Sequence, residues 1–260
     1  MRIVRVREPD GRISFGQQTV NQVLRIQGDL FGLYHVTDEP LPVGQVLAPV
    51  DPPNIVAIGL NYRQHAIETG AEIPTDPVVF AKFTTSLNHP GAPIVLPAGA
   101  TTVDYECELA VVIGRAARNV PEEHALDYVL GYTCANDVSE RTWQKRLGQW
   151  VRAKSFDTFC PLGPWIETDI PDPNALRLST RVNGQLVQDS TTADMIFSVP
   201  KIVSYLSRDM TLLPGTVILT GTPPGVGVAR KPPVFLKAGD VVTVAVEGIG
   251  ELTNPVVAEQ

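Results

Sequence analysis

The 260-residue sequence has few cysteines, no excess of positive charge and no long apolar run. Its three cysteines, Cys107, Cys134 and Cys160, lack Cys-x-x-Cys spacing, which is typical of reduced thiols and argues against a disulfide framework or a cysteine zinc site. The 21 lysines and arginines are outnumbered by 28 aspartates and glutamates, so the net charge is −7 at pH 7. No basic patch for phosphate contacts is visible, and we therefore expect no nucleic-acid partner.

The first ten residues alternate apolar and charged side chains and contain no apolar segment of a signal peptide. No apolar run approaches the length that spans a bilayer, so we expect a cytoplasmic protein with no membrane partner. The 23 prolines and 21 glycines separate short β-like runs. This distribution predicts a β-rich chain with many turns.

A proline-rich stretch from Pro40 to Pro53 divides the sequence into two parts. We expect a small N-terminal β segment over residues 1–50 and a metal-binding catalytic domain over residues 51–260. Apolar runs on both sides of Asp10-Gly11 predict a β-hairpin in the first part. A second hairpin is predicted around Asn183-Gly184, the strongest short hairpin signal in the chain.

The stretch from Val103 to Gly114 carries three carboxylates, Asp104, Glu106 and Glu108, directly into the apolar run Leu109–Ile113. Strand side chains alternate between faces, so the carboxylates are expected on one face, while the unbroken run is typical of a strand buried on both faces. Anions close to burial must be protonated, paired with bases or neutralised by a cation. Oxygen donors favour Mg²⁺, Mn²⁺ or Ca²⁺ over zinc or copper. An exposed acidic edge strand explains the same alternation.

A helix is predicted over residues 60–68, with Asn61 at a plausible N-cap. On this helix His65 and Glu68 are three residues apart and face the same side. A carboxylate that fixes the tautomer of a histidine builds a general base, and an exposed surface pair is the alternative. Farther along, Lys82 could line a pocket, although a solvated loop position is the expectation.

Three more polar positions lie near the ends of apolar runs. Asp137 is placed for a third oxygen ligand or for the N-cap of a helix-like stretch from Glu140 to Leu147. Lys154 lies in a loop and could supply positive charge to the carboxylates, with a surface pair to Asp157 as the alternative. Thr222 lies in a glycine- and proline-rich loop that could present its hydroxyl to an anionic ligand.

Five segments together resemble the fumarylacetoacetate hydrolase family, over about residues 54 to 258. In chain order they are GLNYRQHAIE (59–68), DYECELAVVIG (104–114), GYTCANDVS (131–139), KSFD (154–157) and TGTPPGVG (220–227). The first 50 residues resemble, more weakly, a short N-terminal segment of some bacterial members. The resemblance implies an α+β, β-rich fold, a sandwich-like roll of mixed strands with a small N-terminal β appendage. It also implies a homodimer that binds a divalent metal through three carboxylates.

The site residues implied by the resemblance fall into three groups. The metal ligands, for Mg²⁺ or Mn²⁺ with Ca²⁺ possible in a crystal, are Glu106, Glu108 and Asp137. The catalytic residues, of which the first two form a dyad on a lid helix, are His65, Glu68 and Lys154. The residues expected to contact the oxo acid are Gln144, Thr222, Gly221 and Tyr62. Asp104 matches no family ligand and is expected to support a turn or a hydrogen bond behind the ligands.

The activity implied by the resemblance is metal-dependent hydrolysis of a C–C bond in 2,4-dioxo acids, of the acylpyruvate or fumarylpyruvate type, through a metal-bound enolate. The same residues serve oxaloacetate decarboxylation, and isomerisation or decarboxylation of hydroxylated dienedioates from aromatic catabolism. The alternative of another class is a non-catalytic homologue that binds metal and oxo acid. We predict an enzyme, because a binding protein does not need His65, Glu68 and Lys154 together.

Overall fold

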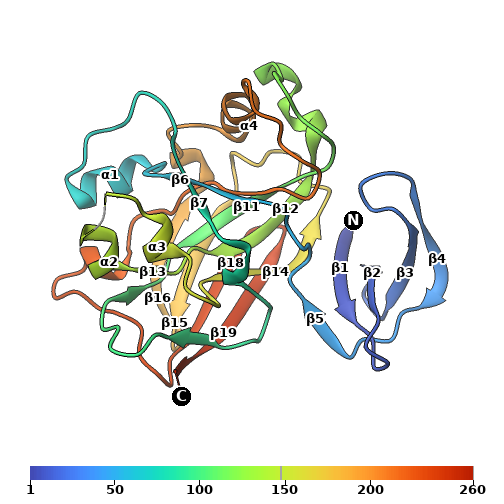
Figure 1. Cartoon of the computed structure of the whole chain (residues 1–260), viewed down its shortest axis with the longest axis horizontal. Coiled ribbons are helices and arrows are strands. Elements are labelled where there is room, and N and C mark those ends of the chain that lie inside the picture. Colours follow the sequence, from blue (N-terminus) through green and yellow to red (C-terminus); the bar gives the residue numbers. More distant parts are fainter. Residues whose placement is uncertain (147, 260) are drawn as a thin grey trace.

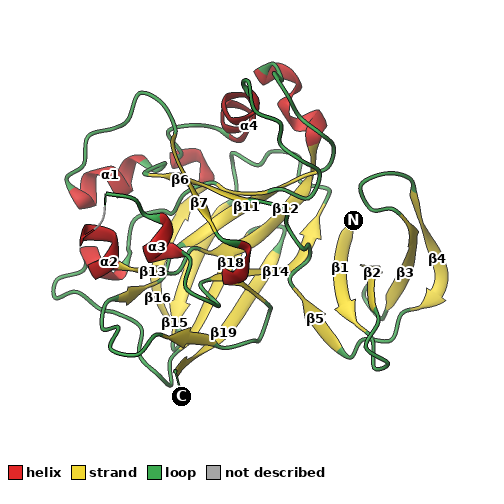
Figure 2. Ribbon diagram, in the orientation of Figure 1, coloured by secondary structure: helices red, strands yellow, loops and turns green. Residues whose placement is uncertain are grey.

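The computed structural model describes residues 1–146 and 148–259, and strands dominate it (Figure 1, Figure 2). Twelve of the described strands form one sheet: β1 (Arg2–Arg7), β2 (Ile13–Gln18), β3 (Val23–Gly28), β4 (Tyr34–Pro40), β5 (Gln45–Leu47), β6 (Ile55–Gly59), β7 (Val78–Lys82), β8 (Leu87–Asn88), β11 (Cys107–Ile113), β12 (Val129–Asn136), β14 (Cys160–Glu167) and β17 (Val217–Leu219). Ten of them follow the order β4-β3-β2-β1-β14-β12-β11-β17-β6-β7, with β5 paired to β1 and β8 to β14.

A second sheet packs against the middle of the first one. Its five strands are β9 (Ile94–Leu96), β15 (Arg177–Val182), β16 (Gln185–Thr191), β18 (Val241–Val246) and β19 (Gly250–Ala258), in the order β16-β15-β18-β19-β9. A short two-stranded sheet joins β10 (Val103–Asp104) to β13 (Ser139–Glu140). Parallel pairs, such as β6 with β17, occur among antiparallel ones. The predicted β-rich fold with mixed strands is therefore confirmed.

The helices are short. They are α1 (Arg63–Thr69), α2 (Arg141–Arg146), α3 (Val151–Lys154) and α4 (Val199–Ser207), with 3₁₀ turns η1 (Thr84–Ser86), η2 (Glu122–Tyr128), η3 (Thr192–Asp194) and η4 (Gly227–Ala229). Helices α1, α2 and α3 gather on one side of the molecule (Figure 1). The predicted helix from Glu140 is observed as α2, and its predicted last residue, Leu147, lies outside the described residues. No helix in the described ranges combines the length and apolar character needed to cross a bilayer.

Strand β11 lies at the centre of the core. Its residues are all buried, and alternate side chains enter two different apolar clusters. Leu109 and Val111 pack in the cluster that also contains residues of β15 and β18, whereas Ala110 and Val112 pack with residues of β6 and β17. The prediction of a strand buried on both faces is confirmed, and burial of each large side chain contributes about 1.5–3 kcal/mol.

Both predicted hairpins are present. Strands β1 and β2 pair on either side of Asp10-Gly11, and β15 and β16 pair on either side of Asn183-Gly184. Asn183 (φ 52°) and Gly184 (φ 80°) occupy the left-handed region, as a tight two-residue hairpin turn requires. The N-terminal strands stand apart in Figure 1, and β1 connects them to the rest of the large sheet, where Ile3 pairs with Ile166 of β14.

Two local expectations are wrong. The carboxylates do not share one continuous strand face, because β10 ends at Asp104 and β11 begins at Cys107. Asn61 does not cap α1, since the N-cap position is Tyr62 and no side chain caps it. The Asn61 amide is fully buried instead, where it donates to the carbonyls of Phe197 (3.0 Å) and Thr220 (2.7 Å) and accepts from Phe197 N (2.8 Å).

We expect Asn61→Ala to lower the free energy of unfolding by at least about 2 kcal/mol, because each buried polar group left without a partner costs roughly 1–3 kcal/mol. Chemical denaturation checks this value, with Gln64→Ala on the exposed side of α1 as the control. Equal stability of the two variants would contradict the role of Asn61 in joining the ends of β6 and β17.

Candidate active site

The site lies at one edge of the large sheet. The carboxyl ends of β6, β12 and β17 meet there with the amino end of β11, because β11 is antiparallel to β12 and β17. A cavity of about 220 Å³ opens at this edge beneath α1, α2 and α3. The expected site residues that line it are His65, Glu106, Glu108, Asp137, Gln144, Lys154 and Thr222. The rest of its wall consists of Ile58, Gly59, Leu60, Ala71, Phe80, Arg141 and Trp150.

Pairing of β11 with β12 brings the three expected ligands together. Glu106 and Glu108 flank Cys107, which lies opposite Asn136, and Asp137 is the next residue along the chain. One ligand oxygen from each carboxylate lies within 4.8 Å of the others, and all three side chains are buried. The Asn136 side chain fixes the arrangement by accepting from Glu106 N at 3.0 Å.

Three basic side chains, all buried, surround two of these carboxylates. Lys154 Nζ donates to Glu106 Oε2 at 2.7 Å and to Asp137 Oδ2 at 2.5 Å. Lys82 Nζ donates to Asp137 Oδ1 at 2.6 Å, and Arg141 Nη2 lies 2.7 Å from Glu106 Oε1. Asp137 and Glu106 therefore each contact two cations.

Glu108 has no basic partner among the described residues, and its Oε2 accepts only from Gly221 N, at 2.7 Å. Burial, Asp137 and Glu106 raise the pKa of Glu108 well above its usual range. Burial also acts to raise the pKa of Glu106, but Lys154 and Arg141 outweigh burial and lower this pKa to about 2. Without a cation, the surroundings of Glu108 therefore favour its neutral form, whereas a bound cation would favour the carboxylate. The oxygen donors of the three side chains fit a divalent metal.

From α1, His65 enters the cavity that the carboxylates line, and Glu68 lies beside it. His65 Nδ1 lies 2.7 Å from Glu68 Oε1, and both Glu68 oxygens accept from Gly225 N at 3.1 and 2.9 Å. Because a carboxylate is an acceptor only, Nδ1 carries the proton and Nε2 is left as the base. Glycine in the left-handed region at Gly70 (φ 67°) ends this helix directly after the dyad.

Gln144 and Thr222, two of the expected substrate contacts, line the cavity. Gln144 Oε1 accepts from Arg141 Nη1 at 2.9 Å, which leaves its amide nitrogen available. Thr222 Oγ1 accepts from Gln188 Nε2 at 2.9 Å, so its hydroxyl proton can be donated to a ligand oxygen.

The other two expected contacts, Tyr62 and Gly221, do not line the cavity. Tyr62 is fully buried in the core. Gly221 (φ 100°) turns the chain where a side chain would lie 2.7 Å from Asn61 Cβ, and its N–H is already used by Glu108. In the structure Gly221 therefore orients the candidate metal ligand Glu108 and does not contact the cavity.

Several alternatives from the sequence are now excluded. Lys154 does not form a surface pair with Asp157, and Lys82 is not solvated, because both lysines are buried against Asp137. Asp137 is not an N-cap, since α2 begins at Arg141. Arg141 is thus the charged residue of the site that the sequence analysis missed, and Lys82 was expected in a solvated loop. No local pattern around either of them marks a buried base.

Asp104 supports the site from behind, as expected of a residue that is not a ligand. Its carboxylate accepts from Gly227 N (2.7 Å), Val228 N (2.9 Å) and Arg141 Nε (2.9 Å). It therefore ties the loop after β17 to the arginine that contacts Glu106.

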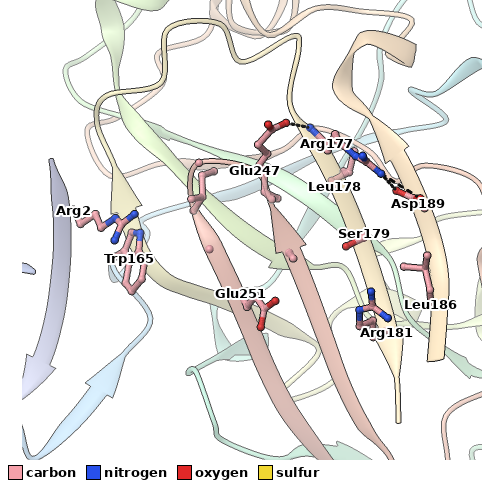
Figure 3. Close-up of a pocket in the computed structure, with 15 residues that line it drawn as sticks. Arg2, Trp165, Arg177, Leu178, Ser179, Arg181, Leu186, Asp189, Glu247 and Glu251 are labelled. Atoms are coloured by element: carbon pink, nitrogen blue, oxygen red, sulfur yellow. Dashed lines mark hydrogen bonds and ion pairs between the residues drawn. The ribbon is translucent and has the colours of Figure 1, made fainter. Parts of the chain in front are cut away.

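A larger hollow of about 700 Å³ lies along β15, β16, β18 and β19, beside Arg2 and Trp165 (Figure 3). Its charges compensate one another: Arg177 Nη2 pairs with Asp189 at 3.2 Å, and the Arg2 guanidinium stacks 4.9 Å from the Trp165 ring centroid. Within the described ranges the three-carboxylate group lies elsewhere, so the smaller cavity is the candidate active site.

Comparison with known proteins identifies the family of this chain. The family model described as fumarylacetoacetate (FAA) hydrolase C-terminal matches residues 54–257, and the model described as Rv2993c-like, N-terminal matches residues 1–49. The chain belongs to the fumarylacetoacetate hydrolase family.

Three similar members of this family illustrate its range. The mitochondrial oxaloacetate tautomerase fahd2 of Xenopus laevis is 51% identical over 217 residues, which cover 82% of this chain and 68% of that protein. Protein Rv2993c of Mycobacterium tuberculosis is 46% identical, over 99% of this chain and 98% of its own length. The crystal structure of a 2-hydroxyhepta-2,4-diene-1,7-dioate isomerase from Mycobacterium marinum superposes with a TM-score of 0.88 at 44% identity, covering 100% of this chain and 99% of that chain.

Replacing Glu108 by glutamine should weaken Mn²⁺ binding by at least about tenfold, since even partners behind metal ligands change affinity by about 10–100-fold. Titration calorimetry of the metal-free protein measures the change, with exposed Glu251→Gln on β19 as the control. Unchanged affinity in Glu108→Gln would show that the three carboxylates are not the metal site.

Proposed function

We propose that this family member catalyses proton transfer next to the carbonyl of a small 2-oxo acid, as in the keto–enol tautomerisation of oxaloacetate. One observation supports this most directly: His65, oriented by Glu68, faces the cluster of Glu106, Glu108 and Asp137 across a single cavity. A base and a cation site in one cavity are what enolate formation requires. A divalent cation bound there would withdraw charge from the 2-oxo and carboxylate oxygens.

In this proposal His65 Nε2 takes the proton from the carbon next to the carbonyl and returns it to the enol oxygen or to carbon. Glu68 accepts from Nδ1 and stabilises the positive charge that the ring gains during transfer. The side chains of His65 and Glu68 are 12% and 22% exposed, so closure of α1 over the substrate would limit access of bulk water.

Lys154 supplies fixed positive charge to the cavity wall. Burial acts to lower its pKa, but Asp137 and Glu106 outweigh burial and raise the pKa of Lys154 above its ordinary value. The ammonium therefore stays protonated. Its three N–H groups already donate to Glu106, Asp137 and Ser139, so it acts on a substrate oxygen through its charge, or donates to it only by giving up one of these hydrogen bonds. Its position over the Phe80 ring, 5.0 Å from the centroid, adds an aromatic face that favours the cation.

The size of the cavity favours a small substrate. A volume of about 220 Å³ lies below the roughly 300–1,000 Å³ typical of pockets for drug-sized ligands. The Trp150 and Phe80 rings, 5.4 Å apart, form part of its wall. A four- or five-carbon oxo acid suits this space better than a hydroxylated heptadienedioate, and the relative named oxaloacetate tautomerase supports this choice.

The second candidate is hydrolysis of a C–C bond in a short acylpyruvate. The partial exposure of His65 favours it, because a water molecule can reach Nε2 from the solvent side and be deprotonated there. Three further reactions would use the same residues: hydrolysis of fumarylpyruvate, decarboxylation of oxaloacetate and isomerisation of a dienedioate. They differ from tautomerisation in the product that is released.

The experiment that separates these candidates uses Mn²⁺-loaded protein and three substrates, oxaloacetate, acetylpyruvate and fumarylpyruvate. Ultraviolet absorbance reports conversion of enol to keto oxaloacetate, and proton NMR reports release of pyruvate. Faster enol–keto conversion without pyruvate supports tautomerisation, whereas acetate and pyruvate from acetylpyruvate support hydrolysis. Turnover of none of them would favour a non-catalytic binding protein.

His65→Gln should reduce turnover by about 10²–10⁴-fold, the usual contribution of a general base, while Mn²⁺ affinity stays at the wild-type value. Steady-state kinetics with the substrate found above checks the first statement, and calorimetry checks the second. His35→Gln, an exposed histidine on β4, serves as the control. A variant at position 65 with wild-type turnover would rule out the dyad as the base.

We further propose that residues 1–50 form a separate segment and that the protein is a homodimer. Separate family matches to residues 1–49 and 54–257 support the boundary. The family resemblance supports the dimer, as does the edge strand β7, where Val78 and Val79 are 40% and 43% exposed. Light scattering after size-exclusion chromatography measures the mass, and a monomer at all concentrations would refute the dimer.

A further inference from the structure

The dyad is held from behind by a backbone group that the proposed reaction does not use. Both oxygens of Glu68 accept from the backbone N–H of Gly225, in the loop after β17. The carboxylate is thus fixed between His65 on its own helix and a peptide group contributed from 157 residues farther along the chain. The orientation of that single peptide decides where the Glu68 carboxylate lies.

Gly225 is itself held in place on three sides. Its φ of 102° lies in the left-handed region, and a side chain would lie 2.3 Å from the carbonyl oxygen of Val187. Its carbonyl accepts from the hydroxyl of Tyr105 at 3.1 Å. The N–H and C=O of this residue therefore point in directions set by Glu68 and Tyr105.

Tyr105 immediately precedes the metal-type ligand Glu106, and it does not line the cavity. Its ring is buried, and its hydroxyl accepts from Arg230 Nε at 3.2 Å while donating to Gly225. Arg230 in turn donates from Nη2 to the Val187 carbonyl at 2.8 Å. Burial raises the pKa of Tyr105, although Arg230 acts in the opposite direction, so the hydroxyl keeps the proton that it donates.

We propose that Tyr105 is a positioning residue for the His65–Glu68 dyad, acting through the backbone of Gly225, whose C=O and N–H belong to two successive peptide groups joined at its Cα. The continuous series of hydrogen bonds runs from Tyr105 Oη to Gly225, from Gly225 N to Glu68, and from Glu68 to His65 Nδ1. The segment that carries the candidate metal ligand Glu106 thereby also fixes the orientation of the His65 ring. The expected change in kcat rests on the proposed function, whereas the expected change in the His65 tautomer does not.

The test is Tyr105→Phe, which keeps the buried ring and removes only the hydroxyl. A hydrogen bond of ordinary net strength predicts a fall in kcat of about five- to tenfold with KM unchanged. Nitrogen-15 NMR of the His65 ring should show one tautomer, protonated at Nδ1, in the wild type and a mixture of tautomers in the variant. Tyr132→Phe, at another largely buried tyrosine on β12, should match the wild type in both measurements.

Mn²⁺ calorimetry on Tyr105→Phe distinguishes this role from support of the neighbouring ligand. Unchanged affinity together with a changed His65 tautomer supports the proposal. An affinity that falls as much as kcat, or a ring with the wild-type tautomer, overturns it. The NMR measurement needs no substrate, so it remains decisive even if the proposed reaction is wrong.

Arg230→Gln provides a second variant in case Tyr105→Phe fails to fold. Losing the donor to the Tyr105 hydroxyl should leave that hydroxyl less well oriented and lower kcat in the same direction by a smaller factor. A wild-type tautomer and wild-type kcat in this variant would count against the series of hydrogen bonds.

Discussion

The lack of a basic partner for Glu108 among the described residues is the constraint on which this site depends. Four buried carboxylates meet three buried bases: Asp104, Glu106, Glu108 and Asp137 against Lys82, Arg141 and Lys154. Removing such charges from water costs several kcal/mol for each ion, and paired geometry offsets this cost only where partners are close. Three carboxylates have close bases and Glu108 does not. The site is therefore arranged to receive one more positive charge beside Glu108.

The fold keeps these charges in place through strand register. Since β11 is buried on both faces and hydrogen-bonded on both sides, Glu108 cannot move without disturbing two apolar clusters. Asn61 joins the ends of the parallel strands β6 and β17, and the N–H of Gly221 ties the end of β17 to Glu108 on β11. Helix α1, by contrast, is short and partly exposed, which suits an element that opens for substrate and closes over it.

Much of this arrangement was predictable from local sequence. Both hairpins, the buried strand at Leu109–Ile113 and the cluster of Glu106, Glu108 and Asp137 follow from turn chemistry, alternation and family resemblance. Local patterns did not predict Lys82 or Arg141, because their burial depends on carboxylates supplied by distant strands.

The break between β10 and β11 and the inward turn of Asn61 were missed for a related reason. Capping and alternation are local preferences, and the hydrogen bonds of Asn61 to Phe197 and Thr220 override them.

We infer that one cation binds between Glu106, Glu108 and Asp137. An anomalous difference map from crystals containing Mn²⁺ tests it most directly. We expect one strong peak in direct contact with an oxygen of each of the three carboxylates. A peak elsewhere, with Lys154 still bridging Glu106 and Asp137 and no ion beside Glu108, would contradict it.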